Sequence, residues 1–290
     1  MRADGALVWA RSDRPSTMIV ETSATESFTD PMRFEGGLLT PDTDGTGRLR
    51  LTGLPAGQQV HYRVTLEGDD GATSEAVTGV FRTAPSAAGD IRLQWSGDTA
   101  GQGYGINPDI GGMRIFDTMA ARDPHLFLHS GDVVYADGPL KESVTLPDGR
   151  VWRNTVSEAK SAVAQTLDQY RGQYAYNLTD DNYRRFNSSV AQIVQWDDHE
   201  TVNNWYPGEV LDLDAYTEKN VDVLAQRHSR RTTSGCRWSR PTRSTAASTA
   251  RSGTAHCSTC SSSTCAPTRT RTGSTPVRPG RFSVRPRRTG

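Results

Sequence analysis

Four ionisable residues stand together in the run Trp196-Asp197-Asp198-His199-Glu200, directly after an apolar stretch at residues 190–194. A strand that ends in clustered carboxylates is unfavourable to bury, because like charges repel and resist dehydration unless a cation lies among them. A metal ion is the simplest such cation, since carboxylates and imidazole are common metal ligands. The run therefore predicts a metal site at the end of a strand.

Two more predicted strands, residues 93–96 and 126–129, also end in acidic turns. A glycine precedes the aspartate in both turns and is expected to permit a sharp change of direction. A single Gly-Asp pair is ordinary turn chemistry. Three strands that each end in an acid instead predict one shared metal site, because parallel sheets bind ligands at the carboxyl ends of their strands. The residues expected to form this site are Asp98, Asp132, Tyr135, Asp198 and His199.

The strands and helices expected around this site form two domains. Residues 1–84 alternate apolar and polar side chains between Gly, Pro and Asp turns, which predicts a small antiparallel β-sandwich without chemistry of its own. Residues 52–57, followed by a Tyr-bearing strand, resemble a loop of fibronectin type III or Ig-like sandwiches. Residues 90–227 show a strand-helix-strand rhythm typical of an α/β domain. The expected helices cover residues 113–121, 157–174, 181–186 and a segment that starts within 213–226.

The net charge of zero hides a sharp division of the chain. Residues 1–227 contain 20 basic and all 33 acidic residues, whereas residues 228–290 contain 13 Arg, no Lys, no Asp and no Glu. All four cysteines lie in that second segment, which has no Leu or Ile. Such a composition offers almost nothing to bury, so a low-order tail is expected. No specific nucleic-acid partner is expected, and neither is a zinc site at Cys257 and Cys260.

A shifted reading frame offers a further hypothesis for the tail. With GC-rich codons, residues 228–239 and 255–267 shifted into one other frame can encode a helix end and a buried strand. We therefore hypothesise that residues 228–290 are an out-of-frame translation that begins near Arg227.

No apolar run is long enough to span a bilayer, and no apolar segment follows Met1 as in a signal peptide.

The three acidic turns together resemble those of the PhoD-like alkaline phosphatases, within the calcineurin-like metallophosphoesterases. The resemblance is carried by Ser96-Gly97-Asp98-Thr99, by His129-Ser130-Gly131-Asp132 with Tyr135, and by Trp196-Asp197-Asp198-His199-Glu200, and it runs to about residue 227. It implies an N-terminal sandwich followed by a metallophosphatase α/β sandwich, of which residues 90–227 would form an incomplete part.

The resemblance also implies roles for single residues. Asp98 and Tyr135 would bind iron (Fe³⁺), Asp132 would bridge iron and calcium, and Asp198 would bind metal, with other divalent metals as alternatives. His199 would contact the substrate phosphate or protonate the leaving group. Weaker candidates, as further ligands or as supports of the ligands, are Asp197, Glu200, Asn203 and Asn204. His125 and His129 are expected to be strand or surface residues, and Asp137 a loop residue.

The implied activity is hydrolysis of phosphate monoesters or diesters by a metal-activated hydroxide. Relatives are secreted or lie in the cell envelope, commonly through twin-arginine export, although no signal peptide is expected in this chain. A monomer is expected. Because residues 228–290 contain no Asp or Glu to complete the site, we expect impaired turnover. The alternative is a non-catalytic remnant or binding protein.

Overall fold

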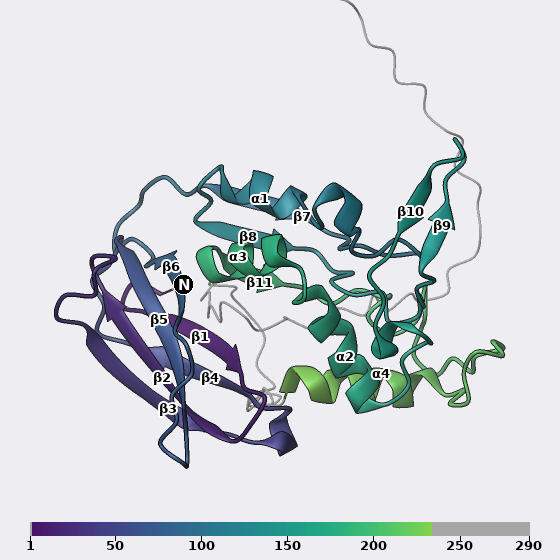
Figure 1. The fold of residues 1–290 in the computed structure, drawn as a ribbon, viewed down its shortest axis with the longest axis horizontal. Coiled ribbons are helices and arrows are strands. Elements are labelled where there is room, and N and C mark those ends of the chain that lie inside the picture. The colour runs from purple at the N-terminus through teal and green to yellow at the C-terminus, as the bar shows by residue number, and fades with distance from the viewer. Residues whose placement is uncertain (1, 234–290) are drawn as a thin grey trace, which may run out of the picture.

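A computed structural model describes residues 2–233, in which a β-rich part precedes an α/β part (Figure 1). The strands of the β-rich part pair antiparallel in two sheets, with the orders β1-β4 and β3-β2-β5-β6. These strands are β1 (Ala6–Arg11), β2 (Ser16–Ser23), β3 (Met32–Leu39), β4 (Thr46–Leu51), β5 (Gln59–Gly68) and β6 (Val77–Arg82), and a short 3₁₀ turn, η1 (Pro41–Thr43), lies between β3 and β4.

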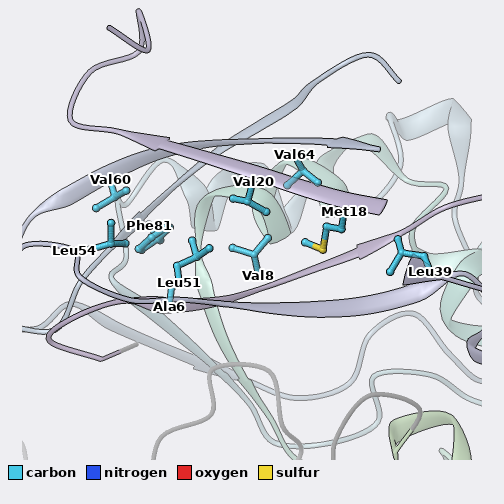
Figure 2. Packing of buried hydrophobic residues seen from close by; sticks show 10 residues of the cluster. All are labelled: Ala6, Val8, Met18, Val20, Leu39, Leu51, Leu54, Val60, Val64 and Phe81. Atoms are coloured by element: carbon cyan, nitrogen blue, oxygen red, sulfur yellow. The ribbon is translucent and has the colours of Figure 1, made fainter. Parts of the chain in front are cut away.

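One apolar cluster holds the two antiparallel sheets together (Figure 2). Val8 and Leu51 enter it from the two-stranded sheet, and Val20, Val64 and Phe81 enter it from the four-stranded sheet. The alternating pattern of the sequence produces this cluster, because successive side chains of a strand point to opposite faces. An antiparallel β module is therefore present. Its structural similarity to fibronectin type III-like sandwiches remains a prediction.

Strand β3 was not anticipated from the sequence. Arg33, Glu35, Gly36 and Gly37 interrupt its apolar pattern, and only its last residue, Leu39, is buried. Because glycine and charged residues have low strand propensity, the sequence gives a weak local signal here. Pairing with β2 forms the strand.

The α/β part is built on a three-stranded parallel sheet with the order β11-β8-β7. The strands are β7 (Leu93–Ser96), β8 (Leu126–His129) and β11 (Ala191–Val194). The last residues of the three strands, Ser96, His129 and Val194, are register partners. All three strands therefore end at one edge of the sheet, as their acidic turns predict.

Helices α1 (Ile115–Ala120) and α3 (Asp181–Ser189) pack together against one face of this sheet. Phe127 of β8 contacts Phe186 of α3 at a ring-centroid distance of 5.3 Å, and Phe186 lies equally far from Phe116 of α1. On edge strand β7, by contrast, Leu93 and Trp95 are 54% and 72% exposed. The sequence predicts both helices, and α3 extends to Ser189 rather than ending at 186.

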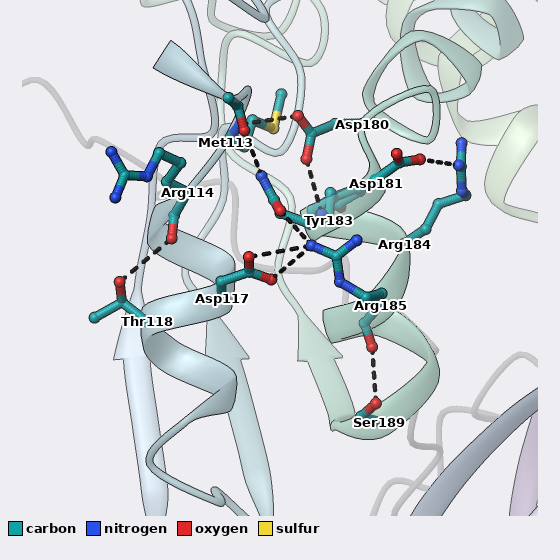
Figure 3. Close-up of polar contacts among 12 residues, drawn as sticks. Met113, Arg114, Asp117, Thr118, Asp180, Asp181, Tyr183, Arg184, Arg185 and Ser189 are labelled. Atoms are coloured by element: carbon teal, nitrogen blue, oxygen red, sulfur yellow. Dashed lines mark hydrogen bonds and ion pairs between the residues drawn. The ribbon is translucent and has the colours of Figure 1, made fainter. Parts of the chain in front are cut away.

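Polar contacts lock α3 to the segment that leads into α1 (Figure 3). The buried Asp180 carboxylate accepts the backbone N–H of Met113 at 2.8 Å with one oxygen and that of Tyr183 at 2.9 Å with the other. Asp180 is the N-cap of α3, so the second bond satisfies a free donor of the first helical turn. Arg185 donates to Asp117 of α1 at 3.0 Å.

The helix predicted over residues 157–174 is wrong in its first half. The structure has a short 3₁₀ turn, η3 (Glu158–Lys160), then a loop, and then α2 (Leu167–Asn177). Thr166 sets the start of α2, because its hydroxyl accepts the N–H of Gln169 while the Gln169 side chain accepts the N–H of Thr166. This capping box defines a helix start within the predicted element.

The last helix also differs from its prediction. Residues 213–219 form turns and irregular chain, and α4 covers Val221–Thr233. The helix therefore continues beyond the tail boundary expected at residue 228, and His228 is fully buried, 2.9 Å from the hydroxyl of Tyr174. The rest of the expected tail, like the reading-frame hypothesis drawn from it, lies outside the described residues.

Three smaller findings complete the fold. Strands β9 (Ser143–Thr145) and β10 (Val151–Arg153) form a hairpin that the sequence analysis missed. A 3₁₀ turn, η2 (Pro108–Ile110), precedes α1. Within residues 2–233, every helix is too short or too polar to cross a bilayer.

Two adjacent acids at the start of α3, Asp180 and Asp181, allow a matched test of the fold. Replacing Asp180 with Ala should lower the free energy of unfolding by about 2–4 kcal/mol, because two backbone donors lose their acceptor and one is a helix cap. The control is Asp181→Ala, which removes an exposed ion pair with Arg184 and should cost at most about 0.5 kcal/mol. Urea denaturation measures both, and equal losses would contradict the assignment.

Candidate metal centre

The turns that follow β7 and β8 are fastened to each other by their backbones. The N–H of Asp98 donates to the carbonyl of Gly131 at 3.1 Å, and the N–H of Thr99 donates to the carbonyl of Asp132 at 2.8 Å. Both aspartates have left-handed backbones, with φ of 57° and 55°. Left-handed non-glycine residues are uncommon and often lie at functional sites. The strand ends therefore hold these two acids in a fixed, unusual geometry.

The two glycines of the Gly-Asp turns are not equivalent. Gly131 has φ of 111°, and a Cβ added there would lie 2.4 Å from the Cβ of Asp197 and 3.0 Å from its backbone nitrogen. Gly97 has an ordinary backbone, and a Cβ there would meet nothing closer than 3.5 Å. The expected need for glycine therefore holds at Gly131 only, where the turn after β8 touches the turn after β11.

The structure brings three of the predicted residues together as a possible ligand set. Asp132, Asp198 and His199 each offer one ligand atom, and these atoms lie within 4.8 Å of one another. Asp98 is outside this set and exposed, but its carboxylate accepts the phenolic O–H of Tyr135 at 2.7 Å. Tyr135 in turn packs its ring against the imidazole of His199 at 4.4 Å. The five residues are thus linked around one edge of the sheet.

The electrostatics of these acids fit a cation. Burial, with the negative charges of Asp198 and Asp197, raises the pKa of Asp132 from 3.8 to about 6, although the charge of His199 opposes the shift. Burial and the hydrogen bond to Asp98 raise the pKa of the Tyr135 phenol. A bound cation would reverse both effects, because it favours the ionised form of each group. Carboxylate oxygens suit Ca²⁺, and a phenolate oxygen suits Fe³⁺.

Asp137 is the site residue that the sequence analysis missed. The sequence predicted that Asp137 is only a loop residue. Its carboxylate instead lies 2.9 Å from Nδ1 of His199, and both side chains are 12% exposed. Burial lowers the pKa of His199, yet the hydrogen bond and charge of Asp137 outweigh burial and raise it overall, with help from Asp132 and Asp198. Asp137 stands two positions after Tyr135, and this short spacing after a Gly-Asp turn was the available signal.

Glu200 supports the site through backbone contacts. Its side chain is 1% exposed, and its two oxygens accept the N–H of Val133 at 2.7 Å and the N–H of Asp197 at 2.9 Å. These bonds tie the turn after β8 to the turn after β11. Burial raises the pKa of Glu200 to about 7, although the two backbone bonds oppose the shift. Asp197 itself is exposed and lies outside the three-residue cluster.

The remaining predicted residues take up other positions. Asn203 and Asn204 are exposed, and their backbone N–H groups donate to Asp137 and Asp198. His129 is a buried strand residue whose Nε2 lies 2.7 Å from the hydroxyl of Thr99. Burial lowers the pKa of His129 to about 4, so it is neutral at pH 7. His125 is also outside the cluster.

Comparisons with known proteins agree with this geometry. Residues 1–85 match the family described as PhoD-like phosphatase, N-terminal domain, and residues 93–231 match the PhoD-like phosphatase family. A curated relative is alkaline phosphatase D of Bacillus subtilis (strain 168), 33% identical over 185 residues. The match covers 64% of this chain and 29% of the relative, so the chain spans less than a third of that protein's length.

The solved structures similar to this chain include two that are 19% and 15% identical to it. One is described as the structure of PhoD, with a TM-score of 0.60 and 19% identity, over 80% of this chain and 43% of the other. This likeness supports a shared fold. The other is a purple acid phosphatase from yellow lupin (Lupinus luteus) seeds, with a TM-score of 0.46 and 15% identity, over 79% and 39% of the two chains.

The contrast between the two glycines can be tested directly. Replacing Gly131 with Ala should lower the free energy of unfolding by about 2–4 kcal/mol, because the new Cβ meets Asp197 and the backbone is left-handed. Gly97→Ala, the matched control, should change it by less than about 1 kcal/mol. Thermal unfolding of the two variants measures the difference, and a tolerated G131A would contradict the proposed contact between the turns.

The raised pKa of Asp132 predicts how the stability of the metal-free protein depends on pH. Between pH 3.8 and about 6, the folded state keeps a proton that the unfolded state has lost. The free energy of unfolding should therefore fall through this window, by about 2–3 kcal/mol from this group, and remain lower above it. Asp132→Asn cannot ionise and lacks this contribution. Urea denaturation at pH 4 and pH 7 should show wild type losing stability relative to D132N, and a pH-independent difference would refute the shift.

Proposed function

The chain belongs to the PhoD-like phosphatase family, and on that premise we propose that residues 90–227 carry part of a metal-dependent phosphoesterase site. The observation that carries this proposal is the cluster of Asp132, Asp198 and His199 at the carboxyl edge of a parallel sheet. The substrates proposed are phosphate monoesters, diesters or both. The proposed metals are iron (Fe³⁺) and calcium, with other divalent metals as alternatives.

Each acid has a proposed place around the metal ions. Asp132 is 7% exposed and shares the cluster with Asp198, which supports a central place for it, where it would bind both iron and calcium. Asp98 and Tyr135 would bind on the side of β7, where the phenol and carboxylate already meet. When bound, the metal ions would polarise the phosphate and lower the pKa of a bound water.

Within the cluster, Asp132 and Asp198 are the proposed metal ligands, and His199 is the proposed catalytic residue. Its Nδ1 is engaged by Asp137, which fixes the ring plane and leaves Nε2 to face a phosphate oxygen or the leaving group. The carboxylate also favours the protonated ring, since its charge raises the pKa of His199. A protonated imidazole can donate a hydrogen bond to the phosphate and pass a proton to the departing oxygen.

The alternative is a metal-binding protein without turnover. In the described part of the chain, one group of three residues places its ligand atoms close enough to share a metal ion. A two-metal phosphoesterase needs more ligands than these, because each ion must hold an oxygen of the substrate or water as well. We therefore expect hydrolysis by this chain to be weak. A monomer, and secretion or an envelope location through twin-arginine export, remain proposals from the family.

Metal binding and hydrolysis can be separated by experiment. The purified chain should bind Ca²⁺ and Fe³⁺ in calorimetric and absorption titrations, and Asp132→Ala should weaken binding about 100-fold because the central carboxylate is lost. Asp148→Ala, which removes an exposed acid outside the cluster, is the control and should bind as wild type does. Failure of the wild-type chain to bind either metal would contradict the proposal.

The same protein should hydrolyse p-nitrophenyl phosphate or its bis ester slowly. Asp137→Asn should retain the metals but lower turnover about 100-fold, because it removes the charge that orients and protonates His199. Metal binding without any hydrolysis would favour the non-catalytic alternative. Hydrolysis that survives both Asp132→Ala and a chelator would not come from this site.

A further inference from the structure

A buried lysine lies directly behind the proposed metal site. Lys160 is 4% exposed, in the 3₁₀ turn η3, and its ammonium donates to the carbonyl of Tyr135 at 2.9 Å and to Oε1 of Gln173 at 2.7 Å. Lysine is almost never fully buried unless its charge is compensated. Both hydrogen-bond partners are neutral, and the acid whose charge favours the ammonium is Asp137. The burial of this charged side chain therefore has to be explained by the groups that it binds next to the site.

The carbonyl that Lys160 binds belongs to the tripeptide Tyr135-Ala136-Asp137. The two outer side chains contact Asp98 and His199, as described above. The central residue joins the same network through its backbone, since the N–H of Ala136 donates to the carbonyl of His199 at 2.8 Å. One short stretch of chain thus carries a proposed ligand, the partner of the proposed catalytic histidine and a backbone bond between two turns.

The segment around Lys160 makes further backbone hydrogen bonds to the tripeptide and the residues that follow it. The N–H of Ala164 donates to the carbonyl of Ala136 at 2.8 Å, and the N–H of Leu140 donates to the carbonyl of Lys160 at 2.7 Å. Gln173 of α2 anchors the ammonium and also donates to the carbonyl of Ala159. The lysine side chain is the link from this scaffold to the carbonyl of Tyr135.

We propose that Lys160 is a positioning residue that fixes the tripeptide 135–137, and thereby sets the placement of the Tyr135 phenol and the Asp137 carboxylate at the metal site. The contacts that carry this inference are independent of metal. Its consequence for iron binding rests on the function proposed above. A purely structural role would predict loss of stability without a local change at the tripeptide.

The test compares Lys160→Met with Asp180→Ala. Methionine keeps the apolar stem but removes the ammonium, whereas the D180A control lowers stability at the α1–α3 contact and leaves the tripeptide intact. Hydrogen exchange of the metal-free proteins, read by mass spectrometry, should show the amides of Ala136 and Ala164 exchanging about tenfold faster in K160M. D180A should leave them close to wild type. Equal exchange in K160M and wild type would overturn the inference.

A second readout tests the consequence for the metal. Titration of wild type with Fe³⁺ should give an absorption band from phenolate coordination, and K160M should need about tenfold more iron to reach it. A wild-type protein without this band would refute the proposed role of Tyr135 in iron binding, while faster exchange in K160M would still support the positioning role. Normal iron binding together with normal exchange in K160M would overturn it.

If K160M does not fold, Gln173→Met serves as a second variant. It removes one of the two partners of the ammonium and leaves the lysine in place. It should loosen the same two amides to a smaller extent, which supports the inference. No loosening in a folded Q173M would overturn it.

Discussion

The repulsion among carboxylates at one edge of a parallel sheet is the constraint on which the rest of this site depends. Asp132 is buried beside Asp198, and its pKa is raised to about 6 because neither burial nor the neighbouring carboxylates favour its ionised form. Such an arrangement persists only where the surrounding chain fixes it. The equal register of three short strands brings the acids together, and the turns that follow must keep them there.

Backbone N–H groups, rather than basic side chains, donate most of the hydrogen bonds that the carboxylates of these turns accept. Glu200 accepts two of them, Asp198 accepts those of His199 and Asn204, and Asp137 accepts that of Asn203. Amide dipoles stabilise a carboxylate without neutralising it. The acids therefore stay available to a cation while their positions are held. Lys160 fits this arrangement, because its ammonium reaches the backbone of the site rather than an acid of the cluster.

The sequence predicted the strands and their acids because those signals are local. An apolar run followed by Asp98, Asp132 or Asp198 identifies a strand end without knowledge of its neighbours. The roles of Asp137 and Lys160 were not predictable in this way, since their partners lie 62 and 25 positions away along the chain. The long helix predicted over 157–174 failed for a different reason. A capping box between Thr166 and Gln169 begins a separate helix there, and the prediction ran one helix across this boundary.

The β-rich part also bears on the site, although it carries no residue of the metal cluster. Its clearest contact with the α/β part is Tyr62 on β5, whose hydroxyl donates to the carbonyl of Ser188 at 3.0 Å. Gly79 on β6 lies so close that an added Cβ would be 2.2 Å from the same carbonyl oxygen. A cavity of about 320 Å³ lies along this boundary. Ser188 is near the end of α3, three positions before β11, the strand that leads to Asp198 and His199. The β-rich part is thus placed to fix the start of the strand whose other end supplies the site.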